Sequence, residues 1–160
     1  MEANILADLK ESYGITCIEI SPVTGGWLNQ KWKVATNKGE LLVKKYSNER
    51  LNSRQLRETE SALQRHIILE KNDVPCPFIW QYGGRAIRLL NDETAYMVMD
   101  FRSGKTENAD TITITQMHSL GSACGLMHKA FSQLPMLSVK SLPFLAVIRW
   151  IYYGITLIPV

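Results

Sequence analysis

The sequence has few of the cysteines that typically stabilise secreted or zinc-binding proteins. Its three cysteines, Cys17, Cys76 and Cys124, are odd in number and far apart, and no CxxC pair occurs. This spacing argues against a disulfide framework or a zinc site and favours a reducing compartment. The first stretch, Met1–Gly14, carries acidic side chains and no long apolar core, so it does not have the pattern of a signal peptide. These features predict a cytoplasmic protein.

The sequence also has no large excess of charge of either sign. Lys and Arg together number 18 against 15 for Asp and Glu, which gives a net charge of +3 over 160 residues. The basic residues are dispersed, and the four tryptophans do not interleave with them. This balance gives little support for binding to nucleic acid or to a membrane surface. The length suits one domain, or one lobe of a larger one.

Acidic residues are missing altogether after Pro135. Within this part, Ser141–Val160 is almost wholly apolar, with Arg149 as its single charge. A transmembrane helix needs about 20 such residues, but two prolines, a glycine and the near-central charge count against a membrane span. We favour a buried helix whose packing partners lie elsewhere, with the membrane segment as the alternative.

Hydrophobic periodicity predicts short strands interrupted by one long helix. An amphipathic helix with Ile5, Leu6 and Leu9 on one face opens the chain and ends at Gly14, since glycine often terminates helices. Apolar or alternating runs bounded by turn residues predict strands at Ile15–Ile20, Leu28–Ala35, Gly39–Tyr46, Phe78–Tyr82, Ala86–Leu90 and Ala95–Phe101.

Two longer helices complete the pattern. The first runs from about Ser53 to Lys71, after the third strand. The second begins near Thr113, which with Gln116 fits a capping box, and it ends before Pro135. Its apolar stripe consists of Met117, Leu120, Cys124, Met127 and Phe131.

The hairpin Val23–Tyr46 is the stretch where a specific chemistry suggests itself. Gly25-Gly26 precedes its first strand, and Lys44 ends the apolar run of its second strand. Adjacent glycines let backbone approach a phosphate, and a strand-borne lysine can neutralise it. Taken singly, a glycine turn and an exposed lysine are the more ordinary interpretations. Lys45 is the alternative to Lys44, although it should point to the opposite face.

Four segments in this order resemble the front part of the aminoglycoside phosphotransferase and choline kinase-like superfamily, which includes homoserine kinase-like and spore-coat kinase-like proteins. The segments are GGWLNQKWKV, ELLVKKY, ETESALQRHIILEKNDVPCP, and AYMVMDFRSG with SLGSACGLMHKAF. The resemblance implies an α+β, protein-kinase-like N-lobe with a five-stranded, mainly antiparallel sheet and one long helix. It implies a nucleotide-binding lobe over residues 1–101, a hinge and the start of a C-lobe over 102–135, and an apolar tail outside the family pattern over 136–160.

The same resemblance implies a nucleotide site. Gly25, Gly26 and Lys44 would contact the phosphates of ATP, and Asn29 completes the family's GG-x-x-N pattern. Glu60 would hold Lys44 in an ion pair. Glu58 is the competitor, but two positions away on a helix it points about 200° round.

The resemblance also places the hinge at the end of the last strand. Adenine would lie against Met99, the carbonyl group of Asp100 and the amide of Arg102. The residues before the hinge can equally be core positions of a strand, and the two interpretations are compatible. The three histidines, at 66, 118 and 128, are not at metal-ligand spacing and are interpreted as structural or surface groups.

The sequence lacks the part of the pattern that carries catalysis. No HxD motif occurs in the chain, whereas the family's catalytic Asp and Mg²⁺ ligands follow the helix that ends near Phe131. We therefore expect these residues to form the ATP-binding lobe of a small-molecule O-kinase that is inactive alone, such as a fragment of a disrupted reading frame. We expect Mg²⁺ to bind only when the missing C-lobe is present. The alternative is a non-catalytic structural protein, such as a kinase-like spore-coat component.

Overall fold

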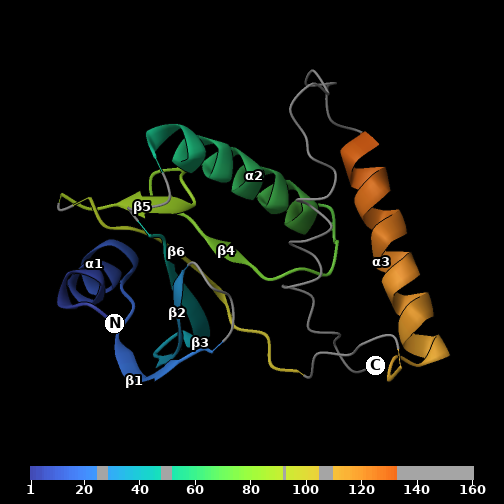
Figure 1. Cartoon of the computed structure of the whole chain (residues 1–160), viewed down its shortest axis with the longest axis horizontal. Helices are drawn as coiled ribbons and strands as arrows, with labels where there is room; N and C mark the ends of the chain where they lie inside the picture. Colours follow the sequence, from blue (N-terminus) through green and yellow to red (C-terminus); the bar gives the residue numbers. More distant parts are fainter. Residues whose placement is uncertain (25–28, 48–51, 92, 105–109, 133–160) are drawn as a thin grey trace. The chain divides into compact units, whose positions relative to one another are not determined.

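We describe the fold from a computed structural model, which covers the chain except for residues 25–28, 48–51, 92, 105–109 and 133–160 (Figure 1). The chain divides into two compact units. The first consists of Met1–Ile67 with Pro77–Phe101, and the second of Ile68–Cys76 with the chain from Arg102 onward. No helix in the described part is long and apolar enough to cross a membrane.

The described residues form three helices and six strands. In chain order these are α1 (Ala3–Tyr13), β1 (Cys17–Pro22), β2 (Gln30–Thr36), β3 (Gly39–Lys45), α2 (Ser53–Lys71), β4 (Ile79–Trp80), β5 (Ile87–Leu89), β6 (Ala95–Asp100) and α3 (Ile114–Ser132). The predicted order of elements is confirmed, and so are the bounds of α2. All six strand runs predicted from periodicity form strands, whereas the count of five implied by the family resemblance is one too low.

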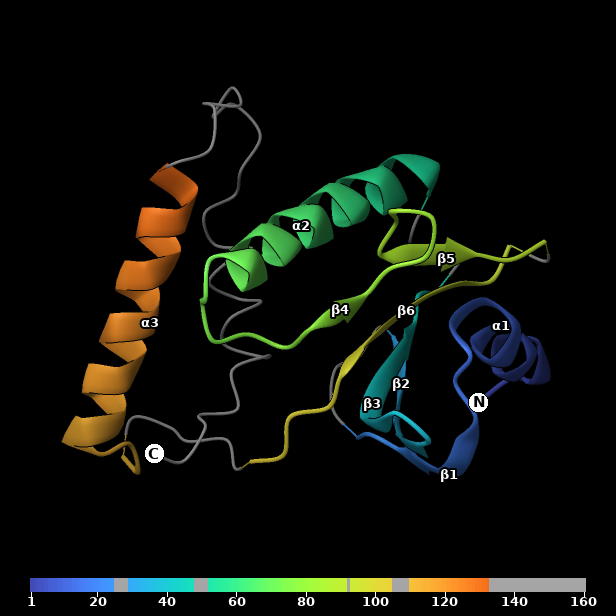
Figure 2. The ribbon, with the colours of Figure 1, turned by 180° about the vertical axis from the view of Figure 1, so that it is seen from behind.

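The six strands make one antiparallel sheet in the order β1-β2-β3-β6-β4, with β5 also paired to β6. The two short strands share one edge of β6, because Ile79 lies opposite Met99 whereas Ile87 lies opposite Met97. Figure 2 shows β4 and β5 following one another alongside α2.

The β2–β3 hairpin fixes the register of the centre of the sheet. Thr36 pairs with Gly39 across a two-residue turn, and Gly39 adopts a φ of 102°, which side chains disfavour. Thr36 closes the turn by donating its hydroxyl to the Gly39 carbonyl group at 2.7 Å. Every later pair on the two strands follows from this turn, including Lys31 opposite Lys44.

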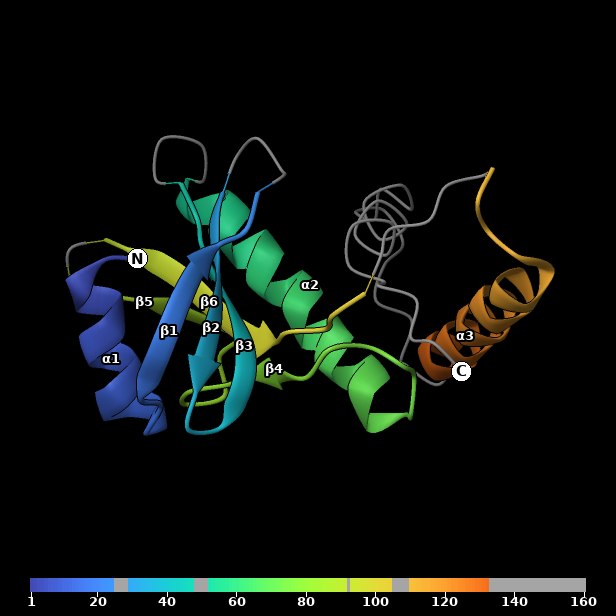
Figure 3. The same ribbon diagram turned by 90° about the horizontal axis from the view of Figure 1, so that it is seen from below.

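Helices α1 and α2 cover opposite faces of the sheet (Figure 3). On one face, Ile5 and Leu9 of α1 are fully buried, whereas Leu6 is half-buried. They pack against strand residues whose side chains all point to this face: Val34, Leu41, Val43, Tyr96 and Val98. We call this side the α1 face.

On the other side, which we call the α2 face, Leu63 and Ile67 of α2 pack against the strand side chains that point away from α1. Their buried partners are Tyr46, Ile79, Ala86, Ile87, Ala95 and Met97. A capping box starts α2, since the Asn52 and Gln55 side chains each accept the other residue's backbone N–H, at 3.1 and 2.9 Å. This cap was not predicted from the sequence.

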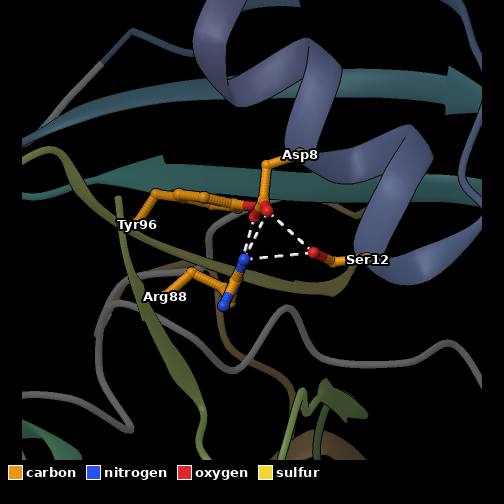
Figure 4. A network of polar contacts seen from close by, with 4 residues as sticks. All are labelled: Asp8, Ser12, Arg88 and Tyr96. Carbon is orange, nitrogen blue, oxygen red and sulfur yellow. Dashed lines mark hydrogen bonds and ion pairs between the residues drawn. The ribbon is translucent and has the colours of Figure 1, made fainter. Parts of the chain in front are cut away.

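Helix α1 is fastened to the sheet by a buried polar cluster (Figure 4). The Asp8 carboxylate accepts hydrogen bonds from the Arg88 guanidinium, from the Tyr96 hydroxyl and, at 2.7 Å, from the Ser12 hydroxyl. These bonds lower the pKa of Asp8 to about 2, chiefly through Arg88. The cluster joins α1 to β5 and β6.

A second set of contacts holds the end of α1. Gly14 takes the left-handed conformation that terminates the helix, as predicted. The Asn37 side chain donates to the Gly14 carbonyl group at 3.2 Å, and Lys38 donates to the Tyr13 carbonyl group at 2.5 Å. The β2–β3 turn therefore satisfies the carbonyl groups that a helix end leaves open.

In the second unit, α3 begins with the predicted capping box. The Thr113 hydroxyl accepts the Gln116 N–H at 3.2 Å, and the Gln116 side chain accepts the Thr113 N–H at 2.8 Å. Only the C-terminal part of its apolar stripe is buried, with Met127 packed near Leu69 and Val74. Ser141–Val160 lies outside the described residues.

Candidate functional site

The structure separates the two adjacent lysines of β3. Lys45 lies on the α1 face, where its ammonium group forms an ion pair with Glu2. Lys44 lies on the α2 face, opposite Lys31 on β2 and Met97 on β6. Strand alternation was the basis for preferring Lys44, and the two side chains do point to opposite faces.

A strip of the α2 face lies beside the area that α2 covers. Along it, Lys31 and Lys44 form one cross-strand pair, and Leu42 and Met99 form another. All four residues are half-buried, whereas Met97 is almost fully buried under α2. The strip thus offers apolar surface at one end and two ammonium groups at the other.

Lys44 is held without a counter-charge. Its Nζ atom lies 4.8 Å from the centroid of the Tyr46 ring, and no carboxylate in the described part of the chain forms an ion pair with it. Burial lowers the pKa of Lys44 to about 8, and the nearby charge of Lys31 adds to this effect. The site is therefore electrostatically suited to an anion.

The predicted Lys44–Glu60 ion pair is not formed. Glu60 instead accepts the backbone N–H groups of Ala86 and Ile87 at 2.9 and 2.8 Å, and the Gln64 side chain at 2.7 Å. Without Glu60 these two amides at the start of β5 would be poorly satisfied, and a single carboxylate can accept hydrogen bonds from both of them. In this structure Glu60 fastens α2 to β5 and forms no ion pair with Lys44.

The hinge residues have separate surroundings. Met99 packs at the border of the α2 face. Asp100 donates its backbone N–H to Phe78 at 2.9 Å, and its carboxylate accepts the indole N–H of Trp80 at 3.1 Å. The Asp100 side chain thus belongs to the α1 face, so any contact with a ligand on the other face would come from its backbone. Arg102 is exposed and belongs to the second unit.

Asn29 closes the open end of the β2–β3 hairpin. Its side-chain carbonyl group accepts the Ser47 backbone N–H at 3.3 Å, so it links the residue before β2 to the residues after β3. Gly25 and Gly26, predicted as the phosphate loop, lie outside the described residues.

Metal ligands are not gathered anywhere in the described ranges, where no group of three or more His, Cys, Asp and Glu side chains is placed to hold an ion. His66 is buried with Nε2 2.6 Å from the Pro77 carbonyl oxygen, which joins α2 to the segment before β4. His118 and His128 are exposed on α3.

Two features of this unit were not predicted from the sequence. Lys31 received no role, although the Asn37-Lys38 turn fixes its position opposite Lys44. Asp8 and Arg88 also received none. A signal for Asp8 was available, because it interrupts the apolar face formed by Ile5 and Leu9.

Comparisons with known proteins agree with this architecture. A sequence profile of the phosphotransferase enzyme family matches residues 19–153, past the point near Phe131 where the predicted resemblance ends. Comparison with curated proteins gives no match.

Among solved structures, the chain is similar to a spectinomycin phosphotransferase in complex with ADP and spectinomycin, with 14% identity and a TM-score of 0.62. It is also similar to a protein from Thermobifida fusca assigned as a fructosamine-3-kinase, with 14% identity and a TM-score of 0.51. The alignments cover 93% and 81% of this chain but only 45% and 40% of those structures. At such identities the likeness concerns the fold, here that of a kinase-like N-lobe.

Proposed function

The chain belongs to the phosphotransferase enzyme family, and from this premise we propose that its residues bind a nucleoside triphosphate, ATP, on the α2 face of the sheet. The phosphates lie at Lys44 and the Gly25-Gly26 loop, with Asn29 holding the ends of the hairpin together. The adenine lies toward Met99 and the backbone of Asp100 and Arg102.

One observation carries this proposal: Lys44 is a half-buried ammonium group on the α2 face of the sheet, with no carboxylate partner among the described residues. A buried, unpaired charge is costly for folding and is unexpected in a purely structural strand. Anionic phosphates would offset that cost. The similar spectinomycin phosphotransferase was solved with ADP, which fits a nucleotide as the anion.

Binding without phosphoryl transfer is the second part of the proposal. Transfer needs a base for the acceptor hydroxyl group and carboxylate ligands for Mg²⁺. The sequence has no HxD motif and no Asp or Glu after Pro135. We therefore propose a cytoplasmic, ATP-binding part of a small-molecule O-kinase, with the nucleotide lobe at residues 1–101 and the hinge and C-lobe start at 102–135. These residues alone would not catalyse transfer.

Isothermal titration with ATP tests the binding claim, with Lys44→Met compared with Lys45→Met. The two variants remove one charge each from neighbouring positions on opposite faces. We expect Lys44→Met to weaken ATP binding by about 30-fold, as befits the loss of a charge-assisted contact worth about 2 kcal/mol, and Lys45→Met to change it less than about threefold. If the parent protein does not bind ATP at millimolar concentration, or if both variants bind like the parent, the proposal is wrong.

A second candidate is a non-catalytic interaction protein. The exposed apolar side chains of α3 favour it, since Ile114, Met117 and Leu126 are 76%, 57% and 42% exposed. The engagement of Glu60 by β5 amides is also compatible with a lobe used as a scaffold. The same titration separates the two candidates, because a scaffold of this kind needs no ATP affinity.

A further inference from the structure

Tyr46 follows β3 directly and lies two positions after Lys44, so both side chains are on the α2 face of the sheet. The Lys44 Nζ atom lies over the Tyr46 ring, 4.8 Å from its centroid, which is within the range of a cation–π interaction. The quadrupole of an aromatic ring makes its face negative and attracts an ammonium group. The Tyr46 ring therefore holds the Lys44 ammonium group at one place on the sheet.

The Tyr46 ring is itself fixed in position. The residue is 3% exposed and belongs to the buried cluster that includes Ile67 of α2. Its hydroxyl group donates a hydrogen bond to the Met97 sulfur atom at 3.1 Å, and its backbone N–H donates to the Ala95 carbonyl group at 2.8 Å. Because the ring is held at its backbone and at its hydroxyl end, the same face stays turned toward Lys44.

An aromatic ring holds a lysine in a different way from a carboxylate. A carboxylate would neutralise the ammonium charge, whereas a ring has no net charge and leaves the full positive charge to a ligand. Burial and the negative charge of Glu60 raise the pKa of the Tyr46 phenol, so the ring stays neutral around pH 7. Tyr46 therefore immobilises Lys44 and keeps it attractive to an anion.

We propose that Tyr46 is a positioning residue of the nucleotide site, whose ring holds Lys44 ready for the phosphates. The inference rests on the proposed function and deepens it. A lysine that is already immobilised loses little rotamer freedom when a phosphate binds, and this preorganisation strengthens binding. Because Tyr46 is almost fully buried, it acts through Lys44 and not by contacting the nucleotide.

The experiment titrates ATP and inorganic tripolyphosphate into the parent protein, Tyr46→Phe and Tyr46→Leu. Tyr46→Phe keeps the ring and loses the hydroxyl group, whereas Tyr46→Leu keeps apolar bulk and loses the ring. We expect Tyr46→Leu to weaken the binding of both ligands about tenfold, and Tyr46→Phe to change it less than about twofold. Ile67→Ala is the matched control, because it removes bulk from the same buried cluster, and it should leave both affinities within about twofold of the parent.

The pKa of Lys44 supplies a readout that a merely structural role of Tyr46 would not change. The ring stabilises the protonated amine, so Tyr46→Leu should lower the pKa of Lys44 further below its value of about 8. Ile67→Ala should leave this pKa nearly unchanged, and an NMR titration of the lysines measures both. If Tyr46→Leu changes neither the pKa nor the affinities more than Ile67→Ala does, Tyr46 is only a core residue and the inference is wrong.

A second series of variants keeps the shape of the ring and changes its charge distribution, which guards against a failure of Tyr46→Leu to fold. Fluorinated phenylalanines at position 46 withdraw electron density from the ring face and weaken its attraction for a cation. ATP affinity should fall stepwise from Tyr46→Phe to the monofluorinated and then the trifluorinated phenylalanine. Equal affinities across this series would overturn the inference.

The outcomes also separate this inference from the function on which it rests. If Lys44→Met loses ATP binding while the ring variants bind ATP like the parent, the role of Tyr46 is refuted and the nucleotide site stands. If ATP binds no better than tripolyphosphate, yet both lose affinity in Tyr46→Leu, the role of Tyr46 in placing Lys44 for an anion stands and the nucleotide assignment fails. If neither ligand binds the parent protein, both proposals fail.

Discussion

The charged side chains of the α1 face differ from Lys44 on the α2 face in whether a partner neutralises them. On the α1 face, Lys45 is paired with Glu2, Arg88 with Asp8, and the Trp80 indole with Asp100. On the α2 face, Lys44 has no carboxylate partner among the described residues and lies opposite a second lysine. Neutralised charges hold an element in place, whereas an unneutralised one is available to a ligand. The paired charges of the α1 face stabilise the fold, whereas Lys44 on the α2 face is the residue on which the proposed nucleotide site rests.

The largest stability effect should come from breaking the cluster on the α1 face. Asp8→Asn leaves the half-buried Arg88 guanidinium without its carboxylate, and we expect a loss of roughly 3 kcal/mol in the free energy of unfolding. Urea denaturation measures it, with the exposed Glu11→Gln on the same helix as the control.

The pH dependence of Asp8→Asn sharpens the same comparison. Because the pKa of Asp8 is lowered to about 2 in the folded protein, its stabilisation is fully present above about pH 4 and is lost as the pH falls toward 2. The parent should lose more stability than Asp8→Asn over this range. Equal acid sensitivity of the two proteins would show that Asp8 is not the group responsible.

A smaller effect is expected from the carboxylate between α2 and β5. Glu60→Gln replaces a charged acceptor of the Ala86 and Ile87 amides by a neutral one, and should cost about 2 kcal/mol. Glu58→Gln, which affects an exposed ion pair with Arg54, should cost less than about 0.5 kcal/mol.

The same variant tests which partner Glu60 has in solution. If Glu60 serves β5, Glu60→Gln should leave the pKa of Lys44 nearly unchanged in an NMR titration. A clear fall in that pKa would mean that the Lys44–Glu60 ion pair forms after all, and the contrast between the two faces would weaken.

The smallest effect should come from Lys44 itself in the absence of ligand. Its pKa in the folded protein, about 8, lies below its unfolded value, so the unfolded chain binds more protons between these values and stability rises with pH from about 8 to 10. We expect a rise of about 1 kcal/mol, limited by solvent screening of a half-buried group. In Lys44→Met the unfolding free energy should vary less with pH over this window, whereas Lys45→Met should retain the parent's slope.

Much of the fold could be predicted because its signals are local. The bounds of α2, the termination of α1 at Gly14 and the capping box of Thr113 depend on hydrogen bonds within one or two turns. The choice of Lys44 over Lys45 needed only the alternation of a strand. Both short strands were also predicted, but their lengths of two and three residues are set by pairing with β6, and the count of five came from the family resemblance.

The sequence by itself determined the order of elements, the family resemblance and the positions of the lysines on the hairpin, because periodicity, turns and alternation act over a few residues. Only the tertiary structure decided the partners of the acidic groups. Asp8 meets Arg88 80 positions away, and Glu60 meets amides 26 and 27 positions away. Which donors surround a carboxylate depends on how helices pack on the sheet, and spacing along the chain does not specify that. This packing leaves Lys44 without a carboxylate partner among the described residues and makes the α2 face the candidate anion site.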